Sequence, residues 1–227
     1  MDRLNGHVEL RDLQKSYGDI VALQQLTLTL EPRELVALVG HNGSGKSTLL
    51  RMIAGLLEPT SGEILIDDEP AGSMEARRAT SYLGDTPVLY DDLSVDEHLA
   101  FIAALHGVED AKPSADALLE RLSLEERRDD LPVRFSRGMR QKTAIAIAFI
   151  RPFDLLLVDE PFVGLDPSGQ EEMRVMLAEA SGAATVMVAT HEMSFLQVAT
   201  RCIALRDGGV VYDGEPPARL ELESFLD

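Results

Sequence analysis

The sequence predicts an α/β fold in which a largely parallel core sheet is joined to an antiparallel β part near the N-terminus and to an inserted helical lobe. Three runs that are apolar throughout indicate central strands, because a strand covered by helices on both faces needs no polar alternation. These runs are Leu35–Val39, Leu155–Val158 and Val186–Ala189. Between the first and second runs the apolar spacing becomes helical, which places the lobe within the core sequence.

The segments near the two ends of the chain predict antiparallel structure. Close to the N-terminus, apolar residues alternate with polar ones, the period of a strand that is covered on one face only. These residues are Val8, Leu10, Leu26, Leu28 and Leu30. Near the C-terminus, a turn at Asp207–Gly209 separates Ile203–Leu205 from Val210–Tyr212. We therefore expect a C-terminal hairpin as well.

The helical lobe is expected from about Asp85 to Ile150, because the sheet pattern resumes only after that point. Its helices are predicted at Val95–His106, Ser114–Leu122 and Gly138–Ile150. The whole chain then forms a single domain over residues 1–227. Residues 1–84 and 151–227 make the core in this prediction, and residues 85–150 make the helical lobe.

Composition excludes several classes of function. The net charge is -18, from 39 acidic and 21 basic residues, and a nucleic-acid binder instead needs a basic surface that neutralises phosphates. The same charge disfavours attachment to anionic lipid by electrostatics alone. The only cysteine, Cys202, permits no intrachain disulfide and is expected to be a buried small residue.

No segment predicts secretion or membrane insertion. The N-terminal residues lack the continuous apolar stretch of a secretory signal, so a cytoplasmic location is expected. Ala144–Ile150, one of the longest apolar runs, is far shorter than the ~20 residues that a spanning helix needs. Any membrane role would therefore come through a partner.

A phosphate-binding loop is predicted at Gly40–Ser47, which fits the pattern G-x-x-x-x-G-K-S/T between a buried strand and a helix. Glycines let backbone amides converge on phosphates, and the helix adds the positive end of its dipole. Lys46 would reach the terminal phosphates and Ser47 would ligate Mg²⁺. The residues expected around the nucleotide phosphates are Asn42, Gly43, Ser44, Gly45, Lys46, Ser47 and Thr48. The alternative is a glycine-rich turn that only joins strand to helix.

Two carboxylates follow the second central strand. Asp159 and Glu160 stand at the C-terminal end of Leu155–Val158, where doubly wound sheets bind their ligands. We expect Asp159 to hold Mg²⁺ and Glu160 to orient and polarise the attacking water, because phosphoryl transfer depends on positioning and charge stabilisation. Taken alone, a strand that ends in Asp-Glu is usually one that only enters a solvated loop.

With these motifs in place, the chain resembles the ATP-binding subunits of ABC transporters over essentially its whole length. Four further segments stand at the places in the chain where the family has its other motifs. Phe135–Gln141 resembles the signature motif, Pro161–Pro167 resembles the D-loop, Thr190–His191 resembles the switch-histidine loop, and Tyr17 resembles the aromatic residue that stacks on adenine. The resemblance implies a P-loop NTPase core, with an N-terminal antiparallel β subdomain and an inserted helical subdomain.

The resemblance also implies a role for each matching residue. Ser136 and Gly138 would contact the γ-phosphate of ATP held by the opposite subunit, and Asp166 would lie at the same interface. His191 would donate to the γ-phosphate. The expected ligands are ATP and Mg²⁺, and the expected partners are a second ATPase subunit and a separately encoded transmembrane permease. The other histidines, His7, His98 and His106, are interpreted as ordinary satisfied side chains.

The sequence departs from the family pattern at two places. The signature has Phe135, Arg137 and Met139 where Leu, Gly and Gln are usual, and this wording resembles the bacterial ABC-2-type exporter branch. Asp85 stands where the family carries a glutamine that touches Mg²⁺. A carboxylate there would either ligate the metal more strongly than an amide or repel the γ-phosphate.

These observations predict an ATPase subunit that dimerises on ATP and drives separate transmembrane subunits, with export favoured over import. The apolar loop Pro87–Tyr90 would anchor a partner helix, or else pack locally within the lobe. A soluble ABC ATPase that acts as a switch and a weakly catalytic ATP-binding regulator are the alternatives. The subunit is expected at the cytoplasmic face of the membrane, held there by its partner.

Overall fold

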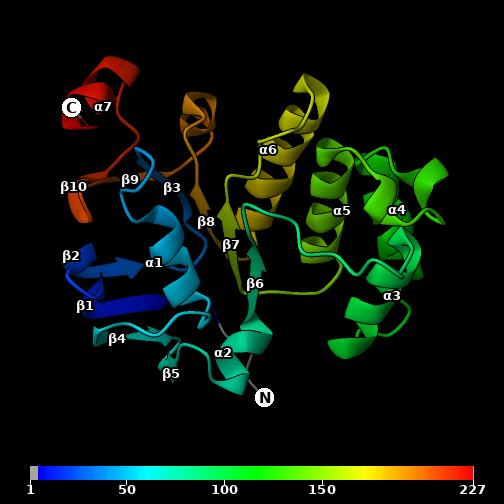
Figure 1. The fold of residues 1–227 in the computed structure, drawn as a ribbon, viewed down its shortest axis with the longest axis horizontal. Coiled ribbons are helices and arrows are strands. Elements are labelled where there is room, and N and C mark those ends of the chain that lie inside the picture. Colours follow the sequence, from blue (N-terminus) through cyan, green and yellow to red (C-terminus); the bar gives the residue numbers. More distant parts are fainter. Residues whose placement is uncertain (1–4, 227) are drawn as a thin grey trace. The chain divides into compact units, whose positions relative to one another are not determined.

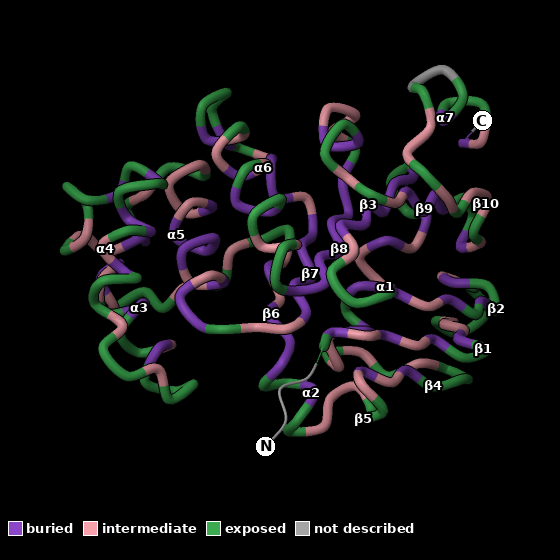
Figure 2. Tube along the Cα trace, turned by 180° about the vertical axis from the view of Figure 1, so that it is seen from behind, coloured by how far each residue is buried: buried purple, intermediate pink, exposed green. Residues whose placement is uncertain are grey.

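The three apolar runs are adjacent parallel strands in a six-stranded sheet of the computed structural model (Figure 1). They form β3 (Leu35–Gly40), β8 (Thr185–Ala189) and β7 (Leu155–Asp159), in this spatial order. Every residue of the three strands is buried (Figure 2). The sequence prediction of central strands covered on both faces is thus confirmed.

Three further strands complete this sheet, in the order β10-β9-β3-β8-β7-β6. The predicted C-terminal hairpin is confirmed as β9 (Arg201–Arg206) and β10 (Gly209–Gly214), which pair antiparallel. β9 also pairs in parallel with β3, so the hairpin extends the central sheet. β6 (Thr80–Leu83) lies at the other edge. Its four residues give too short a pattern to be recognised from sequence.

The antiparallel part is a separate four-stranded sheet in the order β2-β1-β4-β5. The alternating segments form β1 (Val8–Tyr17) and β2 (Ile20–Leu30), as predicted. The other two strands are β4 (Ser61–Ile66) and β5 (Glu69–Pro70). The apolar side of this sheet and residues of the central strands contribute to one buried core. Burial of this shared apolar surface stabilises both sheets together.

The structure describes residues 5–226, and these fall into two compact units. The first unit contains both sheets and is made of Met1–Tyr82, Phe153–Glu160 and Met176–Asp227. Met1–Leu4 and Asp227, the ends of the predicted span, lie outside the described residues. The helices of the first unit are α1 (Lys46–Ile53), α2 (Met74–Ala79), α7 (Arg219–Leu226) and the 3₁₀ helix η3 (Met193–Gln197).

The second unit is helical and is made of Leu83–Pro152 and Pro161–Val175. Its helices are α3 (Val95–Leu105), α4 (Lys112–Arg121), α5 (Arg137–Phe149) and the 3₁₀ helices η1 (Glu125–Arg127) and η2 (Pro132–Arg134). α6 (Pro167–Ser181) begins in this unit and ends in the first. The unit therefore contains a segment after β7 that the sequence analysis places in the core. Contacts between α5 and this segment, described below, account for the difference.

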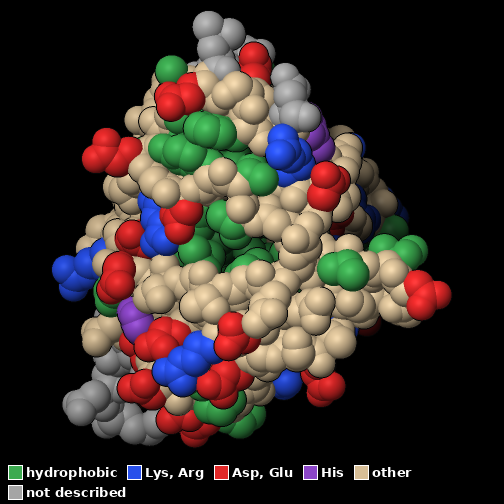
Figure 3. All heavy atoms as spheres, turned by 90° about the vertical axis from the view of Figure 1, so that its left-hand side faces the viewer, with side chains coloured by type: hydrophobic (Ala, Val, Ile, Leu, Met, Phe, Trp, Pro, Cys, Tyr) green, Lys and Arg blue, Asp and Glu red, His purple; other side chains and the backbone are tan. Residues whose placement is uncertain are grey.

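The acidic surface and the buried cysteine are both as the composition predicts. Acidic side chains lie at many points on the face shown in Figure 3, interspersed with basic ones. Cys202 is completely buried in β9, as expected, and burial raises the pKa of its thiol to about 12. Over the described part of the chain, we find no helix of the length and apolarity that crossing a membrane requires.

Candidate nucleotide site

The predicted phosphate loop connects β3 to α1, and two of its glycines adopt backbone angles that side chains disfavour. Gly43 has φ 82° and Gly45 has φ 103°. A Cβ atom at Gly45 would lie 2.8 Å from the carbonyl oxygen of Ala22, whereas one at Gly43 would meet nothing within 4 Å. Gly45 therefore serves close packing within the first unit. The open space at Gly43 leaves its backbone accessible to a ligand.

The first turn of α1 is arranged to accept an anion. Gly45 caps the helix without a side-chain hydrogen bond, and no acidic residue lies in the first turn. The amides at a helix start need partners and lie at the positive end of the helix dipole. The hydroxyl of Ser44 is buried without a hydrogen-bond partner among the described residues. These donors fit the phosphates of a nucleotide.

Lys46 is buried beneath this loop, with 7% of its surface exposed. Its Nζ donates to the carbonyl oxygens of Gly40 at 2.7 Å and His41 at 3.1 Å. Burial lowers the pKa of the Lys46 ammonium, and the carboxylates of Glu160 and Asp159 oppose that shift. The loop thus holds a cation at its centre, close enough to both carboxylates to interact with them electrostatically.

The two carboxylates differ in burial and in backbone conformation. Asp159 ends β7 and is completely buried. Glu160 follows with φ 49°, a left-handed conformation that is uncommon for glutamate. Its amide donates to the carbonyl oxygen of Ala189 at 2.8 Å, which fixes it beside the end of β8. Backbone strain held in place by the surrounding structure often marks a functional residue.

His191 completes a cluster with Glu160. Its Nδ1 lies 2.8 Å from Oε2 of Glu160, and the side chains are 61% and 19% exposed respectively. The preceding residue, Thr190, is buried, and its Oγ1 accepts a hydrogen bond from the Glu192 amide at 3.0 Å. A buried anchor and an exposed imidazole give a side chain that is positioned by the protein but accessible to a ligand.

The donor set fits a metal that takes few protein ligands. No group of three or more His, Cys, Asp or Glu side chains suited to a metal occurs among residues 5–226. Mg²⁺ in nucleotide sites needs no such group, because phosphates and water supply most of its oxygen ligands. The Asp159 carboxylate and the Ser47 hydroxyl, both next to the phosphate loop in the fold, are therefore an adequate protein contribution.

Tyr17 lies at the end of β1 and is 51% exposed. The Nζ of Lys15 is 5.1 Å from the centre of its ring, within range of a cation–π interaction. Gly18 follows in a turn with φ 57°. An exposed ring next to a tight turn has a face that can stack on a planar ligand such as a purine.

The signature residues belong to the second unit, where Ser136 caps α5. Its Oγ accepts a hydrogen bond from the Met139 amide at 3.3 Å. Gly138 lies directly against the D-loop, since a Cβ atom there would be 2.4 Å from the carbonyl oxygen of Gly164. Only glycine fits this contact without displacing backbone. The signature and the D-loop are therefore packed as one piece of structure.

Asp166 is held in the same region by two residues. Ser168 donates to its carboxylate at 2.7 Å, and Nζ of Lys142 lies 3.6 Å away. The Ser168 hydrogen bond, followed by the charge of Lys142, lowers the pKa of Asp166. Gln141, buried in α5, donates to the carbonyl oxygen of Pro161 at 3.3 Å. These contacts explain why Pro161–Val175 clusters with the helical unit.

The structure thus brings some of the predicted site residues together in the first unit and places the others in the second unit. Lys46, Asp159, Glu160 and His191 lie together in the first unit. Ser136, Gly138 and Asp166 lie in the second, as does the exposed Asp85, whose role stays a prediction. From the sequence, Gln141 is the last residue of the signature but has no role assigned to it, and Lys142 is not among the predicted residues. Their place at the end of the signature and directly after it was the one available signal, since the contacts with the D-loop join segments 20 or more residues apart.

Sequence comparisons relate the chain to one family. Residues 23–163 match the family described as ABC transporter. The chain is 33% identical over 210 residues to the SkfA peptide export ATP-binding protein SkfE of Bacillus subtilis, covering 91% of this chain and 88% of that protein. It is also 33% identical over 217 residues to the sulfate/thiosulfate import ATP-binding protein CysA 2 of Agrobacterium fabrum, covering 92% of this chain and 64% of that protein.

A solved structure shares the fold. It is an ATP-binding cassette in a dimeric, post-hydrolysis state bound to ADP and Pi, with a TM-score of 0.83 and 28% sequence identity. The match covers 93% of this chain and 99% of that one. The P-loop architecture predicted from the sequence, with its antiparallel β part and helical part, is therefore confirmed by an independent fold comparison.

Proposed function

Because this chain belongs to the ABC transporter family as an ATP-binding ATPase subunit, we propose that the residues described above bind and hydrolyse Mg-ATP to drive separate transmembrane subunits. The observation that carries the proposal is the contact between His191 and Glu160 beside the buried Lys46 and Asp159. The proposed base Glu160, the cation Lys46 and the proposed metal ligand Asp159 are thus brought together at the C-terminal ends of the central strands.

In this proposal the phosphates bind across Asn42–Thr48, with Lys46 neutralising charge on the terminal phosphates and Tyr17 stacking on the base. Asp159 and Ser47 would hold Mg²⁺, which would supply stabilisation of negative charge on the phosphate oxygens. Glu160 accepts a hydrogen bond from the attacking water and raises its nucleophilicity. Its strained position next to β8 supports this role, because the carboxylate is oriented before substrate arrives.

His191 links the carboxylate to the substrate. Its Nδ1 faces Glu160, so Nε2 is left to meet the γ-phosphate. His191 would therefore detect the γ-phosphate and position Glu160 in one step.

The proposed active state is an ATP-bound dimer, of this chain with itself or with a related subunit. Ser136 and Gly138 are exposed or half-exposed at the start of α5 and would complete the opposite chain's site at its γ-phosphate. Asp166 would lie at the same interface. The dimeric relative bound to ADP and Pi supports this arrangement.

The proposed partner is a transmembrane permease that holds the subunit at the cytoplasmic face of the membrane. Val88 and Tyr90, exposed in the second unit, support the choice of the Pro87–Tyr90 loop as the partner-binding segment. We propose export as the direction, because Ser136–Gln141 has the wording typical of the exporter branch. The relatives do not decide the direction, because the peptide-export and the sulfate/thiosulfate import proteins are both 33% identical to this chain.

Glu160→Gln tests the catalytic assignment. The variant should still bind ATP, because Lys46 and the loop amides are unchanged, but turnover should fall by about a hundredfold or more, as is typical for loss of one positioned catalytic group. Steady-state hydrolysis and equilibrium nucleotide binding measure the two quantities separately. Unchanged turnover would place the catalytic carboxylate elsewhere.

Co-purification with a membrane protein tests the proposed transporter role. Affinity purification of the tagged, otherwise unaltered chain from detergent-solubilised membranes of its own organism should recover a membrane-spanning protein at a constant ratio. Recovery of the chain alone, or with soluble proteins only, would favour a soluble ATPase switch.

A further inference from the structure

His98 is a polar side chain within an apolar stripe of α3. It is 1% exposed and lies among the other buried residues of that helix, Val95, Leu99 and Ala103, which recur at helical spacing. A buried imidazole costs free energy unless its ring nitrogens are hydrogen-bonded. From the sequence, His98 is expected to be an ordinary satisfied histidine, but its two hydrogen-bond partners give it a more specific role.

Both ring nitrogens bond to backbone groups, and those groups determine the tautomer. Nδ1 lies 2.7 Å from the carbonyl oxygen of Ser94, which can only accept, so Nδ1 carries the proton. Nε2 accepts a hydrogen bond at 2.9 Å from the Tyr90 amide, which can only donate. One neutral ring therefore ties the Tyr90 backbone to the first turn of α3.

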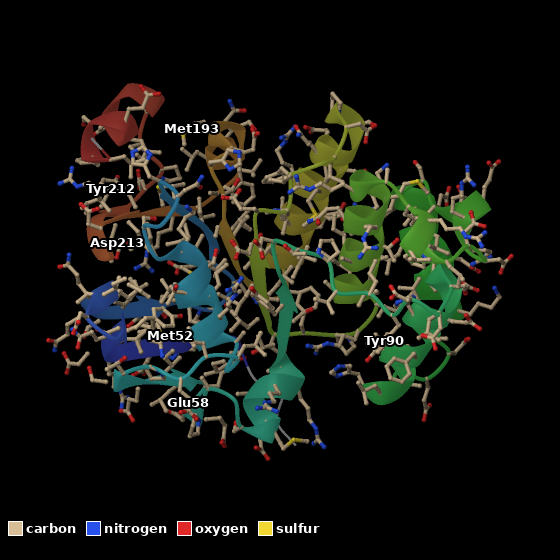
Figure 4. All side chains as sticks on the ribbon, viewed as in Figure 1. Met52, Glu58, Tyr90, Met193, Tyr212 and Asp213 are labelled. Carbon is tan, nitrogen blue, oxygen red and sulfur yellow. The ribbon has the colours of Figure 1, made fainter. Side chains whose placement is uncertain are left out.

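Tyr90 is one of four exposed apolar side chains of the second unit, which we call the docking surface and define as Val88, Tyr90, Phe101 and Leu105. Their exposed fractions are 93%, 53%, 44% and 67%. The Tyr90 ring meets Phe101 edge-on at 5.6 Å and His98 at 5.8 Å. Figure 4 shows Tyr90 beside α3. His98 thus holds the Tyr90 backbone through Nε2 and also contacts the Tyr90 ring, which Phe101 meets as well.

Four exposed carboxylates lie close in sequence to residues of the docking surface. Asp91 and Asp92, both exposed, directly follow Tyr90, and Asp85 is exposed three residues before Val88. Glu97 is exposed four residues before Phe101 and so lies on the same face of α3. Exposed apolar side chains with carboxylates close to them in the chain complement an amphipathic helix whose flanks are basic. Cytoplasmic loops of membrane proteins carry an excess of Lys and Arg, so a membrane partner supplies this chemistry.

We propose that His98 is a positioning residue for this docking surface: its ring fixes Tyr90 so that the surface accepts a basic amphipathic helix from the membrane partner. The proposal rests on the proposed transporter function. It adds the charge of the partner segment and the residue that organises its binding surface.

The positioning role has a direct test in hydrogen exchange at the Tyr90 amide, followed by NMR. His98→Gln keeps an acceptor near the position of Nε2, whereas His98→Leu fills the space without one. We expect the amide to exchange about tenfold faster in H98L than in the unaltered chain, the effect of losing one hydrogen bond. H98Q should stay close to the unaltered chain. Equal protection in all three proteins, or equally fast exchange in both variants, overturns the positioning role.

The partner's chemistry is tested by crosslinking in membranes of the organism itself. Phe101 is replaced by benzoylphenylalanine, and Val133 by the same residue as a control, because Val133 is 51% exposed in the same unit but outside the docking surface. We expect position 101 to crosslink to a cytoplasmic segment with more Lys and Arg than Asp and Glu, and H98L to reduce the yield relative to H98Q.

The outcomes separate this inference from the function on which it rests. A membrane protein that co-purifies but crosslinks equally well in H98L and H98Q, or crosslinks through an acidic segment, overturns the inference alone. Stronger crosslinking from position 133 than from position 101 also overturns it. A chain that recovers no membrane protein at all overturns the proposed transporter function.

Discussion

The two units hold their candidate functional residues in different ways. In the first, Lys46 and Asp159 are buried, Glu160 is partly buried and interacts with Lys46 electrostatically, and the exposed His191 contacts Glu160 directly. In the second, Ser136 and Asp166 are exposed, and their neighbours hold them through packing at Gly138 and the Ser168 hydrogen bond. The first unit thus contains a connected set of groups suited to chemistry. The second contains groups that are positioned but need a ligand from outside their own unit.

Lys46→Ala is expected to have the largest effect, because it removes the cation at the centre of the connected set. Nucleotide binding should weaken and hydrolysis should fall to background. Lys112→Ala is a suitable control, since that lysine is 72% exposed in a pair with Asp116. Normal Michaelis parameters in K46A would show that the loop does not bind the phosphates.

Mixing variants extends this test to the second unit. A chain with Lys46→Ala and another with Ser136→Arg should each be inactive, yet a mixed dimer regains one intact site from Lys46 of one chain and Ser136 of the other. Glu160→Gln, added to the S136R chain, slows hydrolysis and should let ATP trap the mixed dimer on a sizing column. If the mixture forms no more dimer than the separate variants, the site is not shared between chains.

Gly138→Ala should have an intermediate effect, because the new Cβ would lie 2.4 Å from the carbonyl oxygen of Gly164. Relief of that clash would cost about 1–3 kcal/mol, the usual range for overpacking, and would displace the D-loop. We expect a lower melting temperature and weaker ATP-driven dimerisation.

Gly209→Ala provides the matched control, since its Cβ would come no closer than 3.5 Å to a neighbouring atom. If G138A melts and dimerises like G209A, the signature and the D-loop are not packed as tightly as the structure indicates.

Asp85→Gln should have the smallest effect, less than about tenfold on either nucleotide or Mg²⁺ affinity, because an exposed charge acts through high dielectric. Tighter ATP binding or faster turnover would mean that the carboxylate repels the γ-phosphate. Weaker Mg²⁺ binding would instead identify Asp85 as a metal ligand. Calorimetric titrations with each ligand distinguish the two, and no change in either would refute both interpretations.

Patterns with a strong period were predictable from the sequence. The all-apolar runs gave β3, β7 and β8, and alternation gave β1 and β2, because burial on two faces or one leaves a direct signature. The predicted lobe helices agree with α3, α4 and α5 to within two residues at each end. The parallel pairing of β9 with β3 was not predictable, since it joins segments about 165 residues apart.

The chemical types of the site residues were predictable, but their local geometry was not. The phosphate-loop pattern identified Lys46, yet nothing in the sequence indicated the left-handed backbone of Glu160 or its 2.8 Å contact with His191. Likewise, His98 looked like any histidine on an apolar helix face. Its role depends on which backbone groups meet its two nitrogens. The Ser94 carbonyl lies one turn earlier at the start of α3, but the contact with the Tyr90 amide depends on the path of the loop before the helix, which the sequence pattern does not indicate.

The burial of Cys202 has a practical consequence for following ATP-driven dimerisation with attached labels. The thiolate is the form that reacts with maleimides, and a pKa near 12 leaves almost none of it at neutral pH. The native chain should therefore remain unlabelled while folded, without removal of its own cysteine. A cysteine introduced on the surface of either unit would then carry a fluorophore or spin label at a single defined position. Distances between labelled subunits could be followed through ATP binding and hydrolysis in an otherwise natural protein.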